Sequence, residues 1–228
     1  MKLMKNYLSL LAVLLLMGAT CVMYTSCDDD DPVPAPDNSD THEYVDLGLP
    51  TGTLWATCNL GADSPEEYGD YFAWGETAVK DSYSWDTYKW RNSNGDITKY
   101  TTLDEQPELL PEDDAATANW GRKWQMPSRE QIEELINPDY TTSEWTTRNG
   151  VNGLLITSKM PGYEVKSIFL PAAGYYYNST ELYQGGEQGY YWSRTPQSIL
   201  SHTYYLHFSI GIAGGYRSIG RTIRPVRK

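Results

Sequence analysis

The sequence predicts an α+β fold in which two short helices come first and a mainly antiparallel set of strands follows. Two segments carry helix start signals, one near residue 113 and one at residue 128. From residue 150 onward, short runs of β-branched and aromatic residues alternate with glycine-containing turns. Helices and strands that are segregated along a chain are typical of the α+β class, and 228 residues leave room for one sizeable domain behind a leader.

Residues 1–26 have the features of a lipoprotein signal peptide. Lys2 and Lys5 form a positive start, and the apolar run 8–17 is too short for an ordinary membrane span. Ser26 then precedes Cys27, and cleavage between them would leave Cys27 as a lipidated N-terminus. We therefore expect a protein of the outer membrane or cell surface that meets the membrane only through this lipid.

Residues 27–42 are predicted to be an acidic, proline-rich tether. The run "DDDDP" repels itself and stays extended, and the prolines of "VPAPDNSDTH" add stiffness. One interpretation is a solvated spacer. The other is a surface-export signal, because an acidic run after the lipid cysteine resembles that of Bacteroidota lipoproteins. Both hold the domain at 43–228 away from a membrane.

Charge and cysteine content exclude several classes of protein. The formal charge is −12, and removal of Lys2 and Lys5 with the leader leaves 16 basic against 30 acidic residues, which gives −14. Such a chain repels the phosphates of nucleic acid, so we expect no nucleic-acid partner. Cys58 is the one cysteine inside the domain, which excludes a disulfide framework and a cysteine metal cluster. We expect a small buried residue there, and a disulfide to Cys27 is the alternative to lipidation.

The first half of the domain combines broken strands, a long irregular region and the two helices. Short strand-like pieces at 43–61 are interrupted by glycine and proline, and 63–111 is loop-like. The first helix follows Asp113 or Asp114 as N-cap and stops near Gly121. The second has Ser128 as N-cap with Gln131 three residues on, which is a capping-box spacing. Its apolar face is Ile132, Leu135 and Ile136, and its predicted water face is Arg129, Glu130, Glu133 and Glu134.

The second half is predicted to be strands joined by loops. The strand-like runs are "GVNGLLIT", "SIFLPAAGYYY", "GYYWSRT", "TYYLHFS" and "RTIRPV". In "TYYLHFS", alternate side chains point to opposite faces. The segments around 197–203 and 209–219 are predicted to be loops.

Several ordered motifs resemble one family. "VDLGLPTGTLWATCNLGA", "EEYGDYFAWGET", "DDAATANWGRKWQMPSREQIEELI", "SIFLPAAGYYY", "GYYWSRT" and "RTIRPV" are similar to the Fibrobacter succinogenes major paralogous domain family, from about Tyr44 to Arg227. The resemblance implies a C-type-lectin-like fold, shared with formylglycine-generating enzymes, in which two helices flank a small twisted sheet and long loops on one side form a binding face. Members are mostly surface or secreted proteins. It also implies structural roles for Trp120, Trp124, Met126, Trp192, Arg224 and Pro225.

No catalytic or metal motif is present, so we expect a protein that is not an enzyme and needs no cofactor. Formylglycine-generating chemistry needs a cysteine pair, which Cys58 alone does not supply. His42, His202 and His207 fall in no metal-ligand motif, and no GxSxG elbow occurs. The sugar-binding calcium triplets of C-type lectins are missing, and a structural calcium ion is the alternative. An enzyme acting on polysaccharide is the second functional hypothesis, and it requires two carboxylates about 5–9.5 Å apart.

Aromatic side chains offer a calcium-free platform for sugars. Trp74, Trp85, Trp90 and Trp145 lie in or near predicted loops. Burial in the core is the alternative for each of them.

The late segment 198–223 has an unusual composition. It contains aliphatic residues where loops are expected, and it has no Lys, Glu, Gln, Met or Trp. This is the imprint expected of adenine-directed mutagenesis of AAC codons, and it resembles the variable region of proteins diversified by retroelements. No acidic residue follows Glu187, so the segment is neutral to basic in an acidic protein.

We therefore expect a ligand-binding face in the late loops, where exposed apolar groups mark an interaction site. The candidate residues are Arg194, Ser198, Ile199, Leu200, Ser201, His202, His207, Ser209, Ile210, Ile212, Tyr216, Arg217, Ser218 and Ile219. The expected partner is a macromolecule, either protein or glycan. The alternatives are that the aliphatic side chains turn inward, or that the chain is a structural surface or fimbrial component.

Overall fold

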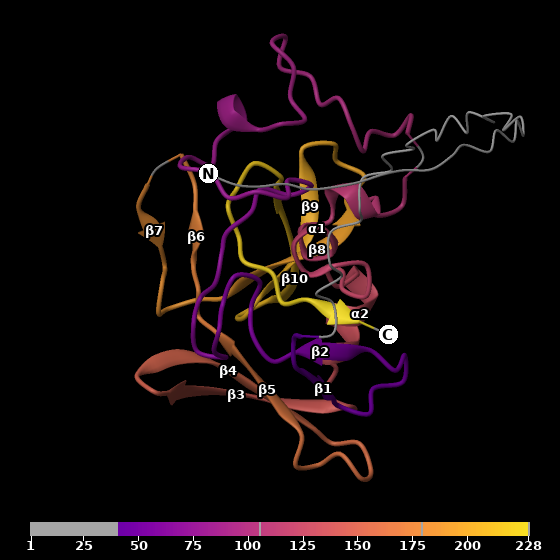
Figure 1. The fold of residues 1–228 in the computed structure, drawn as a ribbon, viewed down its shortest axis with the longest axis vertical. Helices are drawn as coiled ribbons and strands as arrows, with labels where there is room; N and C mark the ends of the chain where they lie inside the picture. Colours follow the sequence, from indigo (N-terminus) through magenta and orange to yellow (C-terminus); the bar gives the residue numbers. More distant parts are fainter. Residues whose placement is uncertain (1–40, 105, 179, 228) are drawn as a thin grey trace, which may run out of the picture. The chain divides into compact units, whose positions relative to one another are not determined.

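The computed structural model describes residues 41–104, 106–178 and 180–227, which belong to one compact unit. The predicted signal peptide, the lipidation at Cys27 and nearly all of the predicted tether lie outside these residues. Within them, short helices and small antiparallel sheets confirm the α+β class (Figure 1). None of the helices in this part of the chain is long and apolar enough to cross a bilayer.

Both predicted helices are present with the predicted caps. Helix α1 (Ala115–Trp120) begins where Asp114 accepts a hydrogen bond from Thr117 N at 3.0 Å, and it ends at Gly121 with φ 91°. Helix α2 (Arg129–Leu135) begins with the reciprocal capping box of Ser128 and Gln131. These local signals are sufficient because each cap satisfies backbone groups that the helix itself leaves unpaired.

One side chain of α2 does not follow the prediction. Glu134 is buried, and its carboxylate accepts hydrogen bonds from the amide and the hydroxyl of Thr51 at 2.9 and 2.6 Å. The predicted water face was therefore wrong at this position. A partner 83 residues away satisfies the charge, and such a contact has no local sequence signal.

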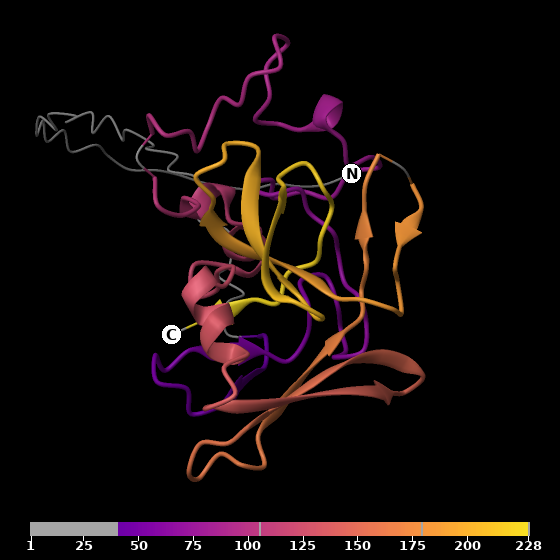
Figure 2. The ribbon, with the colours of Figure 1, turned by 180° about the vertical axis from the view of Figure 1, so that it is seen from behind.

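Four antiparallel sheets make up the strands of the described residues (Figure 2). The first sheet joins β1 (Tyr44–Asp46), β2 (Leu54–Ala56) and β11 (Val226–Arg227), so the two ends of the domain pair with each other. The second contains β3 (Thr141–Arg148), β4 (Val151–Ser158) and β5 (Ser167–Pro171). The third is the pair β6 (Tyr175–Tyr176) and β7 (Leu182–Tyr183), and the fourth joins β8 (Tyr190–Pro196), β9 (His202–His207) and β10 (Gly211–Tyr216).

The core packs on both faces of the sheet β8–β10. Trp192 and Tyr205 lie on one face with Trp120, Trp124 and Met126, which confirms the structural roles predicted for these residues. Tyr191, which precedes Trp192 in β8, and Leu206, which follows Tyr205 in β9, lie on the other face, against the apolar side of α2. Because both faces are covered, the positions of the loops at the ends of these strands are fixed by the core.

Three segments differ from the sequence prediction. Residues 211–216, predicted to be loop, form strand β10, although three of these six residues are glycine. Strand β3 was not predicted, because its sequence TTSEWTTR is polar apart from one tryptophan and shows no alternation. The run 221–226 was predicted to be a strand, but it makes single bridges and becomes strand only at β11. In each case the pairing partner decides the conformation, because β-propensity depends on context.

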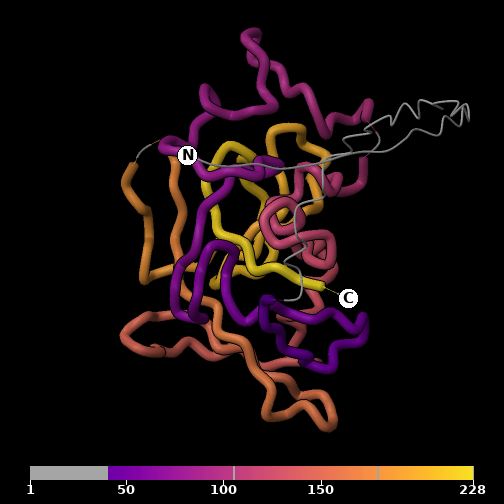
Figure 3. Tube along the Cα trace, in the orientation of Figure 1, coloured from indigo at the N-terminus to yellow at the C-terminus, as the bar shows by residue number. Residues whose placement is uncertain are grey.

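Residues 63–111 follow the prediction of an irregular region. They contain a 3₁₀ turn at Trp85–Thr87 and the start of another at Pro111–Asp113 (Figure 3). Its later part lies over the same end of the sheet as the loop between β8 and β9, with which residues 100–102, 106 and 107 line a pocket (Figures 1 and 3). This shared end carries the candidate site.

Candidate ligand-binding face

The predicted site residues separate into two groups at opposite ends of the hairpin β9–β10. In its register, His202 lies opposite Tyr216 at one end, and His207 lies opposite Gly211 at the other. The two ends are five residue steps apart along β9, which is roughly 17 Å. We call them the loop end, which carries the β8–β9 loop 197–201, and the turn end, which carries the turn 208–210.

The loop end carries exposed aliphatic side chains beside a pocket. Ile199 is 57% exposed and Leu200 is 39% exposed. Leu200 lines a pocket of about 300 Å³ between the β8–β9 loop and the segment 100–107. The pocket lining is Tyr100, Thr101, Thr102, Gln106, Pro107, Pro196, Gln197, Ser198 and Leu200, and no charged side chain is among these residues.

An aromatic rim continues the loop end beyond the pocket. The ring of Tyr216 lies 4.6 Å from that of His202 and 5.8 Å from that of Trp85. Ser201 Oγ is 2.9 Å from His202 Nδ1, and burial together with the charges of Arg217 and Arg221 lowers the pKa of His202. At neutral pH the rim therefore presents an uncharged imidazole beside two aromatic rings.

The candidate tryptophans have different positions. Trp74 is buried in the core, and its indole donates to Ser193 O at 2.8 Å. Trp145 is exposed on β3 and contacts Phe208 near the turn end. Trp85 and Trp90 are partly exposed, and Trp85 reaches the rim of the loop end. Of the four, Trp85 is the one placed to contact a ligand there.

Arg217 is a structural clamp, which corrects its predicted role as a surface ligand contact. Its guanidinium is buried and donates to His202 O at 3.2 Å and to Tyr100 O at 3.1 Å from both Nη atoms. It also donates to Lys99 O at 3.3 Å and lies 4.7 Å over the ring of Trp74. The clamp ties the segment 99–107 to the hairpin and so holds the two walls of the pocket together.

Ser218 and Ile219 are also buried, and the prediction that they face solvent was wrong. Ile219 packs in the same core cluster as Trp192. The chain turns inward directly after Tyr216 because Phe72 and Arg221 form a bridge that draws the segment under the long loop. No local sequence pattern indicates this bridge, since its two residues are 149 positions apart.

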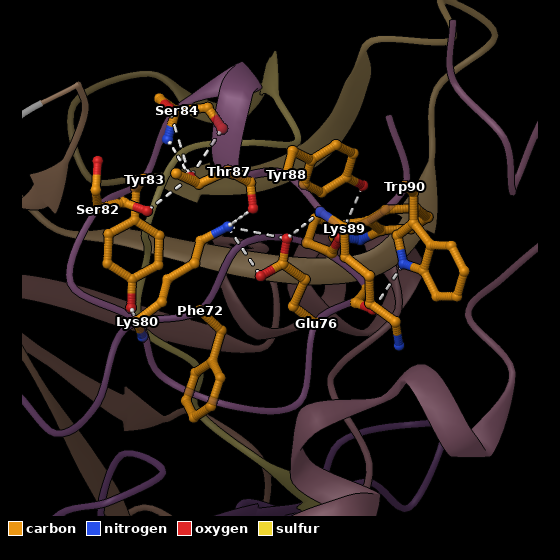
Figure 4. A network of polar contacts seen from close by, with 12 residues as sticks. Phe72, Glu76, Lys80, Ser82, Tyr83, Ser84, Thr87, Tyr88, Lys89 and Trp90 are labelled. Carbon is orange, nitrogen blue, oxygen red and sulfur yellow. Dashed lines mark hydrogen bonds and ion pairs between the residues drawn. The ribbon is translucent and has the colours of Figure 1, made fainter. Parts of the chain in front are cut away.

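A second buried charge fixes the loop that carries Trp85. Figure 4 shows the Glu76 carboxylate between the side chain of Lys80 and the backbone of Lys89. It accepts a hydrogen bond from Lys80 Nζ at 2.9 Å and from the amide of Lys89 at 2.8 Å. Lys80 also donates to Thr87 O at 3.0 Å. The ion pair therefore closes residues 76–89 into one rigid loop behind the aromatic rim.

The turn end has a different construction. Ile210 is 67% exposed, whereas Ile212 packs partly against the core under α2. Ser209 accepts a hydrogen bond from Gln188 Nε2 at 2.8 Å, and its amide donates to His207 Nδ1 at 3.1 Å. Burial and the charge of Arg221 lower the pKa of His207. The turn is held by these hydrogen bonds and by packing of Phe208 on the rings of Tyr191 and Trp145.

Arg194 belongs to neither end. Its guanidinium donates to Glu108 at 2.6 Å, to Met126 O at 2.7 Å and to Gln131 at 3.0 Å. It joins the long loop to the start of α2, so its predicted place in the ligand-binding face is not supported.

The described residues do not assemble a group of His, Cys, Asp and Glu with metal-binding geometry. The adjacent carboxylates Asp113 and Asp114 are both buried and have separate partners. Asp113 binds Lys99 and the Tyr100 hydroxyl, while Asp114 accepts from the amide of Met126 at 2.8 Å. Burial raises the pKa of Asp114 to about 6. Cys58, expected to be buried, is a partly exposed free thiol.

Sequence reasoning missed one wall of the pocket. The segment 101–107 looked like any polar loop, and its importance follows from Arg217, which binds the carbonyl groups of Lys99 and Tyr100. Comparison of the chain with protein-family models, with curated proteins and with solved structures gave no match. Any function is therefore argued from the geometry.

Proposed function

We propose that this chain is a lipid-anchored surface receptor whose C-type-lectin-like domain binds a protein ligand through the loop end. The observation that carries the proposal is an exposed apolar surface beside a pocket whose described lining residues are uncharged, standing on backbone that two buried charges hold in place. Ile199 and Leu200 supply the apolar contact, and Trp85 and Tyr216 supply aromatic anchors. Aromatic residues of this kind are enriched where protein interfaces gain most of their binding energy.

The arrangement of elements supports the lectin-like part of the proposal. Two short helices accompany small antiparallel sheets, and long loops gather at one end of the sheet β8–β10 (Figure 1). In the family that the motifs resemble, such loops form the binding face. Many proteins carry their binding residues on loops that a rigid scaffold holds in position.

The chemistry of the loop end favours a protein over a glycan. Exposed aliphatic groups such as Ile199 gain little from hydroxyl-rich sugars, whereas a partner protein removes them from water. The hydroxyl and amide groups of Thr101, Gln106 and Gln197 then bind polar groups of the partner within the pocket.

A binding screen with matched variants tests this proposal. The full-length chain, purified in detergent, is applied to arrays of purified extracellular proteins and to a glycan array. We expect a protein ligand whose binding is lost in the double variant Ile199→Ser/Leu200→Ser and kept in Ile210→Ser. Ligands lost equally in both variants would contradict the loop end as the site, and a glycan as the loop-end ligand would contradict the partner class.

We further propose that the loop end varies between closely related strains through a retroelement. The composition of 198–223 supports this, and the structure narrows the positions, because Arg217, Ser218 and Ile219 are buried. Sequencing of the locus in related isolates should find substitutions concentrated at 198–202 and 209–216, beside a template repeat and a reverse transcriptase. An invariant segment without a template would end this part of the proposal.

The anchor at Cys27 is tested separately. Labelling of cells with an alkyne fatty acid should modify the wild-type chain and leave Cys27→Ser unlabelled, while accessibility to an external protease reports surface exposure. Equal labelling of Cys27→Ser would refute the assigned lipidation site.

A further inference from the structure

Strand β3 forms an open edge of its sheet. In the order β3–β4–β5 it pairs with β4 alone, and residues 142–145 are exposed along it. Within the described ranges, the backbone of 142–148 makes hydrogen bonds in the β3–β4 ladder and to no other segment. The hairpin lies at the lower end of the domain in Figure 1, away from the β8–β9 loop, so this edge is separate from the loop end. A row of unpaired N–H and C=O groups is a template on which another strand can pair.

The ladder shows which backbone groups of β3 are unpaired. The carbonyl of Asn152 and the amide of Ser158 both bond toward the β5 side of β4, at 2.8 and 3.0 Å. Backbone groups of successive strand residues point to opposite sides, so the odd-numbered residues of β4 bond toward β3. In the register they face the even-numbered residues of β3. The N–H and C=O groups of Ser143, Trp145 and Thr147 therefore point outward at the edge.

The sequence of β3 lacks the features that commonly protect an edge from pairing. The run TTSEWTTR contains no proline, glycine or lysine, and its register with β4 runs from Thr141 to Arg148 without a bulge. Threonine and tryptophan make up most of the strand, and both favour β-structure. Its two charged residues, Glu144 and Arg148, have opposite signs. The edge can therefore accept a strand whose charges are complementary.

A second copy of β3 supplies such a strand. In an antiparallel pair around a two-fold axis, Trp145 meets an outward-facing residue when it lies opposite Ser143, Trp145 or Thr147 of the second copy. The first register places Glu144 opposite Glu144, which is destabilising. The second places Glu144 diagonal to both Glu144 and Arg148, so attraction and repulsion offset each other. The third places Glu144 directly opposite Arg148 on both sides of the axis, and charge complementarity selects it.

The side chains of β3 fit this third register. Within the described part of the chain, no hydrogen bond or ion pair holds the carboxylate of Glu144. The side chain of Arg148 is 44% exposed although its Nε lies 3.3 Å from a carboxylate oxygen of Glu66, so its outer nitrogens can meet a second carboxylate. Trp145 is 48% exposed, and pairing with Thr147 of the second copy would remove part of its apolar surface from water.

We infer that β3 is the contact surface of a homodimer, in which two antiparallel copies of β3 join their sheets with Trp145 opposite Thr147 of the second copy. Each such pair exchanges both of its backbone hydrogen bonds, and the pairing of Glu144 with Arg148 on either side of the axis fixes the register. The contact is small, so the dimer is weak and reversible. It does not depend on the proposed protein ligand of the loop end.

Cysteine cross-linking tests the dimer and its register together. Thr146 lies opposite itself on the axis of this register, where the two Cα atoms are about 4.5 Å apart, a distance that a disulfide can span. The full-length chain with Thr146→Cys is produced in cells in a Cys58→Ser background, because Cys58 is a free thiol. The cells are then treated with a mild thiol oxidant.

The matched control for this cross-link is Thr142→Cys. Thr142 lies on the same face of the strand, is more exposed than Thr146 and does not meet itself in the dimer. We expect a disulfide-linked dimer of Thr146→Cys, and only background levels with Thr142→Cys and with the Cys58→Ser parent. A Thr146→Cys chain that cross-links no more than Thr142→Cys, or that cross-links to a different protein, would overturn the inference.

A charge reversal supplies the second measurement. Glu144→Lys places like charges opposite each other at Arg148, so the cross-linked fraction of Thr146→Cys should fall about 5-fold or more. Glu130→Lys makes the same charge change at an exposed residue of α2 and should leave the fraction unchanged. Both substituted side chains are exposed, so both variants should keep the fold. An equal fall in both variants, or no fall in Glu144→Lys, would contradict a register set by charge pairing.

Discussion

The loop end and the turn end of the hairpin β9–β10 both expose aliphatic side chains, but they differ in what holds them. At the loop end, the buried Arg217 ties the backbone next to Ile199 to the distant Tyr100, and the buried Glu76 fixes the separate loop that carries Trp85. At the turn end, Ile210 is more exposed than Ile199, and its neighbours are held by ring packing of Phe208 and by hydrogen bonds within the turn and with Gln188. Exposure of an apolar residue therefore does not by itself indicate a binding site.

The difference between the two ends indicates which of them can bind a partner more tightly. A surface that is already ordered loses little conformational entropy when a partner binds. A clamp that is buried and saturated with acceptors provides this order, whereas a two-strand turn provides less. Substitution of Arg217 and of Glu76, one at a time, should therefore affect the loop end and leave the turn end unchanged.

The largest effect is expected from Arg217→Met. The substitution leaves the carbonyls of His202, Lys99 and Tyr100 without their donor, which should lower the free energy of unfolding by about 3 kcal/mol. Urea denaturation measures this loss. Amide exchange should accelerate in 99–107 and 197–202 and stay unchanged at 208–210.

The matched control is Arg129→Met. Arg129 is an exposed arginine in an i,i+4 pair with Glu133, so its loss should change the stability little. If the two variants lose equal stability, or if exchange accelerates at both ends of the hairpin, Arg217 is not a clamp specific to the loop end.

A smaller effect is expected from Glu76→Gln. The amide side chain keeps the shape but removes the ion pair with Lys80 and weakens the bond from the Lys89 amide, at a cost of about 1–2 kcal/mol. Hydrogen exchange of the Lys89 amide should become faster. The control is Glu133→Gln, which removes an exposed ion pair. An unchanged exchange rate of the Lys89 amide in Glu76→Gln would show that Glu76 does not fix the loop.

The fold and the site differ in how far the sequence predicts them. The N-cap Ser128 was predicted to the residue and the N-cap Asp114 as one of two neighbouring candidates, because capping depends on three or four neighbouring positions. Strand β10 was missed, because its glycines have low β-propensity and its conformation comes from pairing with β9.

The candidate site was predicted in part for the same reason. The exposed positions Ile199, Leu200 and Tyr216 were recognised from composition, which is a local property. The buried roles of Arg217 and Ser218 depend on partners more than a hundred positions away or on the inward turn of the chain, and no local pattern reports them. The opposite wall of the pocket was missed because nothing in its own sequence distinguishes it.

Surface substitutions should separate stability from binding. Ile199→Ser and Ile210→Ser each replace an exposed side chain, so each should change the free energy of unfolding by less than about 0.5 kcal/mol. Thermal denaturation of both variants checks this. A large loss in Ile199→Ser alone would mean that this residue supports the loop itself and would weaken its assignment as a ligand contact.

The smallest effect concerns the two histidines of the hairpin. Burial is the main cause that lowers the pKa of both below 6.5, but the charge of Arg217 contributes at His202 and not at His207. Arg217→Met should therefore raise the pKa of His202 and leave that of His207 in place, while Arg217→Lys, which keeps the charge, should move neither. A titration of the imidazole proton signals by nuclear magnetic resonance measures the pKa of both histidines in the wild type and in each variant.

The sign of the linked stability follows from the same shifts. A histidine whose folded pKa lies below its unfolded value favours the fold in its neutral form, so this stability is present above about pH 6.5 and is lost as the pH falls through the lowered pKa. The loss on acidification should be smaller in Arg217→Met than in Arg217→Lys, because His202 then resists protonation less. Equal upward shifts of both histidines in Arg217→Met would show that the clamp acts on the whole hairpin, and the distinction between its two ends would fail.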